Sequence, residues 1–389
     1  MQRNTKYKYL MSLGHFCSDI NQGALSAVLP FLIAAYGYSY ATAASLVMIS
    51  NLVGSAVQPL IGYVSDKRNT AWAIPIGMLM AGGGIALTGF TSSFFGLCCA
   101  VVLSGTGVSL FHPQAVKFVN YASGQHDKAR SIGIFSFGGS LGFSLGPLIV
   151  STAILTFGMR GTGVFLVMEI IACALFFSQY GSLTELGASR GRASSGAAAR
   201  GADDWGAFAR LCLVIFGRSI MMCGMNTFLA LYWIHELGQT ESAGSAALSV
   251  YYAMGAACTL IGGRLADRFG CRRMIRLSLS VYIPAILLLA STRSVYLAGA
   301  LMLPIVASLY FSYSPMVVLG QQYLPNHVGF ASGVTLGLAI SIGGLTVPLL
   351  GMLADSFGLR ASFFAMAAVA IIPLIGSFFL RPARGAESE

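Results

Sequence analysis

Charged residues are scarce in this sequence. Only 9% of its 389 residues are Asp, Glu, Lys or Arg and 56% are hydrophobic, whereas a soluble domain carries about 25% charged residues. A core of this size cannot hide so many apolar side chains behind a polar surface. The composition excludes a soluble monomer and indicates a chain that lies in a lipid bilayer.

Motifs of several function classes are also missing. The eight cysteines form no CxxC or Cys/His metal spacing, so we assign them no redox role and expect no metal. Gly82–Gly84 and Gly105 lie in apolar runs without a Walker lysine, which argues against an ATP-binding loop. The N-terminus lacks the cleavage pattern of a signal peptide. We expect neither an enzyme nor a cofactor, and energy that comes from an ion gradient.

Long apolar segments dominate the chain. A membrane span needs about 20 apolar residues, and twelve segments are candidates: 9–36, 42–64, 71–90, 94–121, 131–157, 161–180, 207–235, 243–266, 274–291, 295–323, 330–354 and 361–380. Residues 181–206, rich in Gly, Ala, Ser and Arg, are expected to form a flexible linker. We predict an all-α membrane protein with twelve transmembrane helices, in two six-helix bundles over residues 1–180 and 207–389.

The basic residues are distributed unevenly between alternate connections. The termini, the linker and the connections on their side hold nearly all Lys and Arg, while the other side holds only Arg160, Arg293 and Arg360. Cytoplasmic loops retain positive charge during insertion. We therefore attribute the net charge of +10 to membrane topology rather than nucleic-acid binding, and expect both termini and the linker to be cytoplasmic.

The two halves repeat each other. Four pairs of residues share an offset of 201: Asp66 and Asp267, Ser131 and Ser332, Gly142 and Gly343, Pro147 and Pro348. Pairs of this kind that recur at one offset indicate two repeats of the same orientation. This is the arrangement of a transporter whose bundles rock about a site near the membrane midplane.

The first span carries a polar stripe. Ser12, His15, Asp19, Gln22 and Ser26 follow each other at intervals of three and four residues, so they share one helix face. An ionisable stripe is too costly to face acyl chains. We interpret it as a proton and substrate site; the alternative is a structural polar pair that fixes this helix to its neighbours.

The fourth span adds a histidine beside a proline. Ser109 and His112 share a face, and Pro113 breaks the helical hydrogen-bond ladder next to the imidazole. His112 is a candidate gate or proton carrier, with an ordinary interhelical hydrogen bond as the alternative. We therefore assign proton coupling to Asp19, His112 and His15.

The seventh span contains Arg218, a basic residue well inside a helix of the second half. It either grips an anionic substrate with two parallel hydrogen bonds, or balances a buried carboxylate such as Asp19 or Glu169. The tenth span presents tyrosines around Pro315, which either contact substrate or pack as ordinary aromatics. The candidate substrate-binding residues are Gln22, Ser109, Gln114, Arg218, Asn226, Tyr310 and Tyr313.

The connection after the eighth span carries a strong motif. The run from Gly263 to Arg273 (GRLADRFGCRR) resembles the cytoplasmic signature of the major facilitator superfamily, whereas its first-half counterpart from Gly62 is degenerate. The alternative is a positively charged loop of no special design. The resemblance implies a gating role for Asp66, Gly263, Asp267, Arg268, Gly270, Arg272 and Arg273.

The fifth span matches the beginning of the antiporter pattern of that superfamily. Gly133, Gly142, Gly146 and Pro147 fit it, and the match ends before Val150. We add Gly142, Gly146 and Pro147 to the gating candidates; the alternative is a small-residue face on which helices pack closely.

Two segments of the first half resemble one branch of the superfamily. Residues 14–19 (GHFCSD) and 111–115 (FHPQA) are similar to segments of fosmidomycin-resistance transporters. The resemblance implies a multi-pass protein of the bacterial inner membrane that exports a small phosphonate drug in exchange for protons. An uptake symporter or a uniporter of a small metabolite is the alternative. The expected partners are the substrate, protons and lipid, and we expect a monomer.

Overall fold

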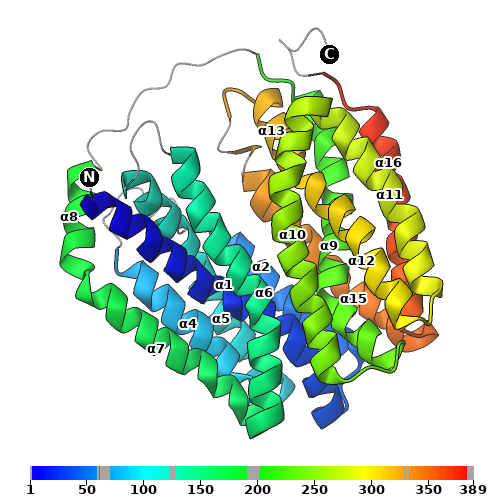
Figure 1. The fold of residues 1–389 in the computed structure, drawn as a ribbon, viewed down its shortest axis with the longest axis horizontal. Coiled ribbons are helices and arrows are strands. Elements are labelled where there is room, and N and C mark those ends of the chain that lie inside the picture. The colour runs from blue at the N-terminus through cyan, green and yellow to red at the C-terminus, as the bar shows by residue number, and fades with distance from the viewer. Residues whose placement is uncertain are drawn as a thin grey trace. The chain divides into compact units, whose positions relative to one another are not determined.

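The computed structural model describes residues 2–58, 61, 71–122, 128–190, 202–327, 330–331 and 333–382. Within these ranges every regular element is a helix (Figure 1). The first half of the chain forms α1 (Gln2–Tyr36), α2 (Tyr40–Ala56), α4 (Ala73–Leu87), α5 (Phe94–Ala122), α6 (Lys128–Phe157), η1 (Met159–Thr162), α7 (Gly163–Ser178) and α8 (Tyr180–Arg190). The second half forms α9 (Trp205–His235), α10 (Glu241–Phe269), α11 (Cys271–Ser291), α12 (Val295–Phe311), α13 (Tyr313–Tyr323), η2 (Gly333–Leu338), α15 (Ala339–Phe357) and α16 (Leu359–Phe378).

These helices account for the predicted spans. Among the described residues, ten helical stretches are long and apolar enough to cross a membrane, and the shorter apolar helices Tyr40–Ser55 and Ala73–Leu87 match the second and third predicted segments. α12 and α13 count as one stretch, Val295–Tyr323, although the helix is interrupted at Ser312. The prediction of an all-α membrane protein with twelve transmembrane helices is confirmed.

Large apolar side chains cover the outward helix faces. On α7, Val167 and Ile171 are 55% and 67% exposed, and on α10 Leu260 is 68% exposed. A soluble protein rarely exposes contiguous apolar surface of this kind. A helix satisfies its own backbone hydrogen bonds, so such faces are stable against acyl chains.

The described helices group into two compact units. Unit 1 comprises Met1–Tyr36 and Ile49–Gly196, and unit 2 comprises Gly37–Met48 and Ala197–Glu389. The division differs from the predicted bundles in two places. The beginning of α2 belongs to unit 2, and the boundary between the units lies within the predicted linker, after Gly196.

The predicted linker is shorter than expected. Residues 181–190 belong to α8, whose Leu183 is buried in the apolar core of unit 1. The prediction of a flexible linker from residue 181 is therefore wrong for this part of the chain, because Tyr180 and Leu183 pack α8 against that core. The low-complexity residues 191–201 lie outside the described part of the chain.

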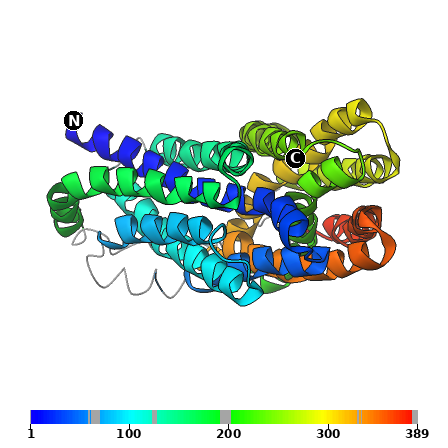
Figure 2. The ribbon, with the colours of Figure 1, turned by 90° about the horizontal axis from the view of Figure 1, so that it is seen from below.

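In unit 1, α6 packs along α1 (Figures 1 and 2), and glycines of α6 form the close contacts. A Cβ at Gly142 would lie 2.4 Å from the carbonyl oxygen of Phe16, and one at Gly146 would lie 2.5 Å from that of Ile20. Only glycine permits this backbone approach. The packing interpretation of the α6 glycines is therefore supported by their contacts, and their gating role stays a prediction.

Unit 2 repeats this arrangement with α15 and α9. A Cβ at Gly343, the repeat partner of Gly142, would lie 2.5 Å from the carbonyl oxygen of Ser219 on α9. The repeat that the sequence predicts thus corresponds to equivalent helix contacts inside the two units.

Candidate functional site

Three titratable side chains of unit 1 meet at the contact between α1 and α5. The Nε2 atom of His15 lies 3.0 Å from Asp19 Oδ2, and the Nε2 atom of His112 lies 3.1 Å from Asp19 Oδ1. We call His15, Asp19 and His112 the triad. Asp19 is buried, so the predicted proton-coupling residues share one site inside the protein.

Local structure explains how the triad forms. His15 and Asp19 are four residues apart on α1, which places them on one face a single turn apart. His112 precedes Pro113 on α5, and its Nδ1 bonds to the carbonyl of Val108 at 2.9 Å. The Nδ1 of His15 bonds to the carbonyl of Phe135 on α6 at 2.8 Å. Two backbone carbonyls therefore fix the orientation of both rings.

Neighbouring groups enclose the triad. The ring of Phe135 stacks on the His15 ring with centroids 4.0 Å apart. Gln22 donates a hydrogen bond of 2.9 Å to Asp19 Oδ1. Gly139 on α6 leaves room for both polar groups, because a Cβ there would lie 2.5 Å from the His15 ring and 2.6 Å from Asp19 Oδ2.

The other first-half candidates have different surroundings. The hydroxyl of Ser109 lies 3.0 Å and 2.8 Å from the carbonyls of Val53 and Gly54 on α2, where it joins two helices. Gln114 is fully buried on α5, and Gln22 is bonded to Asp19. Substrate binding by these residues stays a prediction.

A second polar pair lies on another face of α1. Glu169 of α7 is buried and accepts a hydrogen bond of 2.8 Å from the amide of Asn21. Gly82 of α4 provides the space, since a Cβ there would lie 2.3 Å from Glu169 Cγ. Sequence reasoning missed this pair, because neither residue lies on the Asp19 stripe.

In unit 2, Arg218 lies among tyrosines. It is buried, donates from one terminal nitrogen to the carbonyl of Leu309 at 2.9 Å, and lies 5.2 Å from the ring centroid of Tyr313. The rings of Tyr310 and Tyr251 are in contact, with centroids 5.9 Å apart. We call Arg218, Tyr251, Tyr310 and Tyr313 the arginine cluster.

The arginine cluster retains unused hydrogen-bonding capacity. Within the described part of the chain, Arg218 Nε is buried without a hydrogen-bond partner, and so are two polar atoms outside the cluster, Asn226 Oδ1 and the Tyr282 hydroxyl. Buried polar groups are rarely left in this state, and an anion would accept from the guanidinium. Tyr251 and Tyr282 were not among the predicted site residues, because a tyrosine in an apolar run gives no signal that separates packing from binding.

The partners of the carboxylates bear on the alternative role of Arg218. Asp19 is bonded to His15, His112 and Gln22, and Glu169 is bonded to Asn21, all inside unit 1. Each carboxylate therefore has a donor of its own within unit 1, while Glu169 Oε2 is buried without a hydrogen-bond partner in the described part of the chain. The ion-pair alternative for Arg218 stays a prediction.

The two sites occupy equivalent helix positions. Gly142 faces the carbonyl of Phe16, and its repeat partner Gly343 faces that of Ser219, 203 residues further along the chain. The same spacing relates His15 to Arg218 and Asp19 to Met222. The terminal nitrogen of Arg218 lies 3.5 Å from the Met222 sulfur, as His15 lies against Asp19. The same place in the repeat carries a titratable pair in unit 1 and a fixed cation in unit 2.

The motif of the predicted cytoplasmic connection forms the turn between α10 and α11. Gly270 ends α10 with a φ of +85°, a conformation that glycine adopts without strain. Gly263 and Arg268 lie on α10, while Arg272 and Arg273 begin α11. Asp66 and the side chain of Asp267 lie outside the described residues, so the gating assignment stays a prediction.

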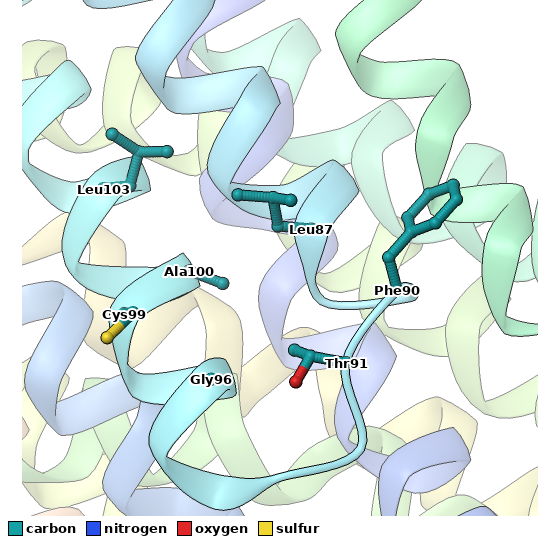
Figure 3. A pocket seen from close by; sticks show the side chains of 7 residues that line it. All are labelled: Leu87, Phe90, Thr91, Gly96, Cys99, Ala100 and Leu103. Carbon is teal, nitrogen blue, oxygen red and sulfur yellow. The ribbon is translucent and has the colours of Figure 1, made fainter.

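One surface pocket lies apart from the triad residues. Figure 3 shows it at the connection of α4 to α5, where Leu87, Phe90, Ala100 and Leu103 are among the lining residues. No predicted site residue lines it.

Comparison with known proteins identifies related sequences. The model of the Major Facilitator Superfamily matches residues 11–210 and 208–389. The Fosmidomycin resistance protein of Escherichia coli (strain K12) is 28% identical over 370 residues, which cover 94% of this chain and 90% of that protein. The Uncharacterized MFS-type transporter YfnC of Bacillus subtilis (strain 168) is 28% identical over 388 residues, covering 97% and 93% of the two chains.

Solved structures share the fold. A bacterial homologue of the human lysosomal transporter Spinster superposes with a TM-score of 0.83 at 16% identity, over 97% of this chain and 96% of that one. A D-xylose-proton symporter gives a TM-score of 0.72 at 14% identity, over 99% of both chains. The resemblance inferred from the sequence motifs is thereby confirmed for the superfamily and for the similarity to the fosmidomycin-resistance branch.

Proposed function

Because this chain belongs to the Major Facilitator Superfamily of membrane transporters, we propose that it is a secondary transporter that exchanges protons for a small polar or anionic compound by alternating access. The direction is efflux, and a phosphonate drug is the model substrate. The observation that carries the proposal is the triad, a buried carboxylate between two imidazoles inside a membrane protein. Intramembrane ionisable groups of this kind mark ion pathways.

The triad has the chemistry that proton exchange requires. Histidine gains and loses a proton near physiological pH, and Asp19 supplies the negative charge that stabilises a protonated ring. The proposed mechanism takes its energy from a proton gradient and calls on no nucleotide or other cofactor. The protein is proposed to be a transporter and not an enzyme.

The arginine cluster supplies the proposed substrate contacts. A buried guanidinium with an unused Nε–H offers a charge-assisted fork to a phosphonate or carboxylate oxygen. The similarity to a protein that bears the name Fosmidomycin resistance protein favours a phosphonate. Asn226 and Tyr310 are proposed to contact the rest of the substrate.

Topology and gating complete the proposal. We place the protein in a bacterial inner membrane as a monomer with both termini in the cytoplasm, on the basis of the uneven distribution of Lys and Arg. The Gly263–Arg273 connection then faces the cytoplasm. Asp267 with Arg268, Arg272 and Arg273 is proposed to close that side of the transporter in one of its states, with Asp66 in the other repeat.

Transport in sealed vesicles tests the proposal. Purified protein is reconstituted in liposomes, a pH gradient is imposed, and uptake of a radiolabelled phosphonate against the proton flux is recorded. The Asp19→Asn variant should reconstitute and fold normally but lose pH-driven flux. The asparagine keeps the shape of the side chain but cannot gain or lose a proton. Glu241→Gln, which neutralises a carboxylate at the beginning of α10, is the matched control and should transport normally.

Two outcomes contradict the proposal. Unchanged pH-driven flux in Asp19→Asn removes the coupling role of the triad. Substrate that moves together with protons supports the uptake symporter, and flux that ignores the pH gradient supports the uniporter.

A further inference from the structure

The hydrogen positions on the two histidines follow from their backbone contacts. His15 Nδ1 faces the carbonyl of Phe135 at 2.8 Å, and His112 Nδ1 faces the carbonyl of Val108 at 2.9 Å. A carbonyl oxygen only accepts hydrogen bonds. Each Nδ1 therefore carries a hydrogen, and a neutral ring in this position has a bare Nε2.

Both bare Nε2 atoms face the same carboxylate. His15 approaches Asp19 Oδ2 at 3.0 Å and His112 approaches Asp19 Oδ1 at 3.1 Å. Without added protons, each contact would set a nitrogen lone pair against an oxygen lone pair. Each contact therefore needs one hydrogen, whether it resides on nitrogen or on oxygen.

We propose that the triad binds two exchangeable protons, one at each contact between an Nε2 atom and the Asp19 carboxylate. The site carries a net charge of +1 with both protons, zero with one and −1 with none. The inference rests on the proposed function, because it assigns a number to the protons that the transporter exchanges.

The surroundings place these protons on the rings. Gln22 donates to Asp19 Oδ1, and a donated hydrogen bond favours the ionised carboxylate. Of the other helices packed against α1, α4 and the described side chains of α6 carry no titratable group. Lys117 follows His112 by more than a turn on α5, and Glu169 of α7 is bonded to Asn21 on another face of α1.

The two protons are not equivalent. The side chain of His112 is 22% exposed and that of His15 is 11% exposed, and Asp19 Oδ1 has a second donor in Gln22. The two contacts therefore differ in their surroundings. The contact of His112 joins α5 to α1, whereas the contact of His15 lies within α1, so the proton at His112 links two helices.

Nitrogen NMR of the histidine rings tests the proposal. The full chain with ¹⁵N-labelled histidine is reconstituted in lipid, and the ring shifts are followed from acid to alkaline pH. We expect both triad rings to be imidazolium at acid pH and to lose their protons in two separate steps, with Nδ1–H retained in each. His327→Gln, which alters an exposed histidine bonded to Asp203, assigns that signal and should leave both steps unchanged.

Proton counting provides the second measurement. In weakly buffered detergent, a pH-sensitive dye should record one proton fewer per molecule for His112→Gln than for the unaltered chain, and likewise for His15→Gln. A single protonation step, or a triad ring that carries its hydrogen on Nε2 with Nδ1 bare, overturns the inference. Two protons without proton-driven flux contradict the proposed function only, and proton-driven flux with one proton contradicts this inference only.

Discussion

The triad depends on a residue that has no side chain. Gly139 of α6 faces His15 and Asp19 so closely that an added methyl group would lie 2.5 Å from the ring and 2.6 Å from Oδ2. We predict that Gly139→Ala displaces these side chains and lowers pH-driven transport, with a loss of stability of about 1–3 kcal/mol, the usual cost of overpacking. Thermal unfolding and vesicle transport measure the two effects.

Gly133→Ala is the matched control for this substitution. It lies on the same helix, and a Cβ there meets nothing within 4 Å, so the helix gains propensity without a clash. Equal behaviour of the two variants would mean that Gly139 does not shape the triad.

For single residues, the sequence predicted which side chains share the site better than it predicted the contacts that position them. The spacing of His15, Asp19 and Gln22 placed them on one face, and the three are in contact in the structure. Their backbone partners could not be predicted, because the carbonyl of Phe135 and the close approach of Gly139 depend on how α6 packs. The pairing of Glu169 with Asn21 was missed for the same reason.

Single helices were predicted well in position and less well at their ends. Apolar length located every span, because the bilayer sets that length. It did not reveal the interruption at Ser312 or the π-helical turn Gly333–Leu338, since both segments remain apolar. It also missed α8, where low-complexity composition begins before the helix ends.

The N-terminus of α2 is held by a distant side chain, a contact that no local sequence signal could predict. Asp355 of α15 accepts hydrogen bonds from the backbone N–H groups of Tyr40 and Ala41 at 2.7 Å and 3.0 Å, within unit 2. Free N–H groups at a helix N-terminus favour such an acceptor. We predict that Asp355→Ala costs about 1 kcal/mol and speeds hydrogen exchange of the first turn of α2, as mass spectrometry would record.

Asp355→Asn separates this cap from a general effect of the substitution. The asparagine keeps one acceptor oxygen, so it should retain part of the protection against exchange. Protection that is unchanged in Asp355→Ala would show that the backbone of α2 is held by other contacts.

For the whole molecule, the internal repeat predicts that the two units have different functions. Unit 1 carries the triad, and unit 2 carries Arg218 at the position that corresponds to His15. A titratable pair responds to pH, whereas an arginine remains charged at every physiological pH. Proton binding and substrate binding should therefore be separable by substitutions in different units.

The last prediction tests this separation with Arg218→Lys and Arg218→Met. If the guanidinium binds a phosphonate, Lys should weaken binding by about tenfold or more, because a point charge does not replace two charge-assisted hydrogen bonds. Both variants should keep the ¹⁵N titration of the triad, while Asp19→Asn should change that titration and still bind substrate. Equilibrium binding of a phosphonate to purified protein and thermal unfolding measure affinity and stability.

If Arg218→Met instead loses stability with affinity intact, and neutralising Asp19 or Glu169 restores that stability, Arg218 is an ion-pair partner and the anion-binding role is wrong.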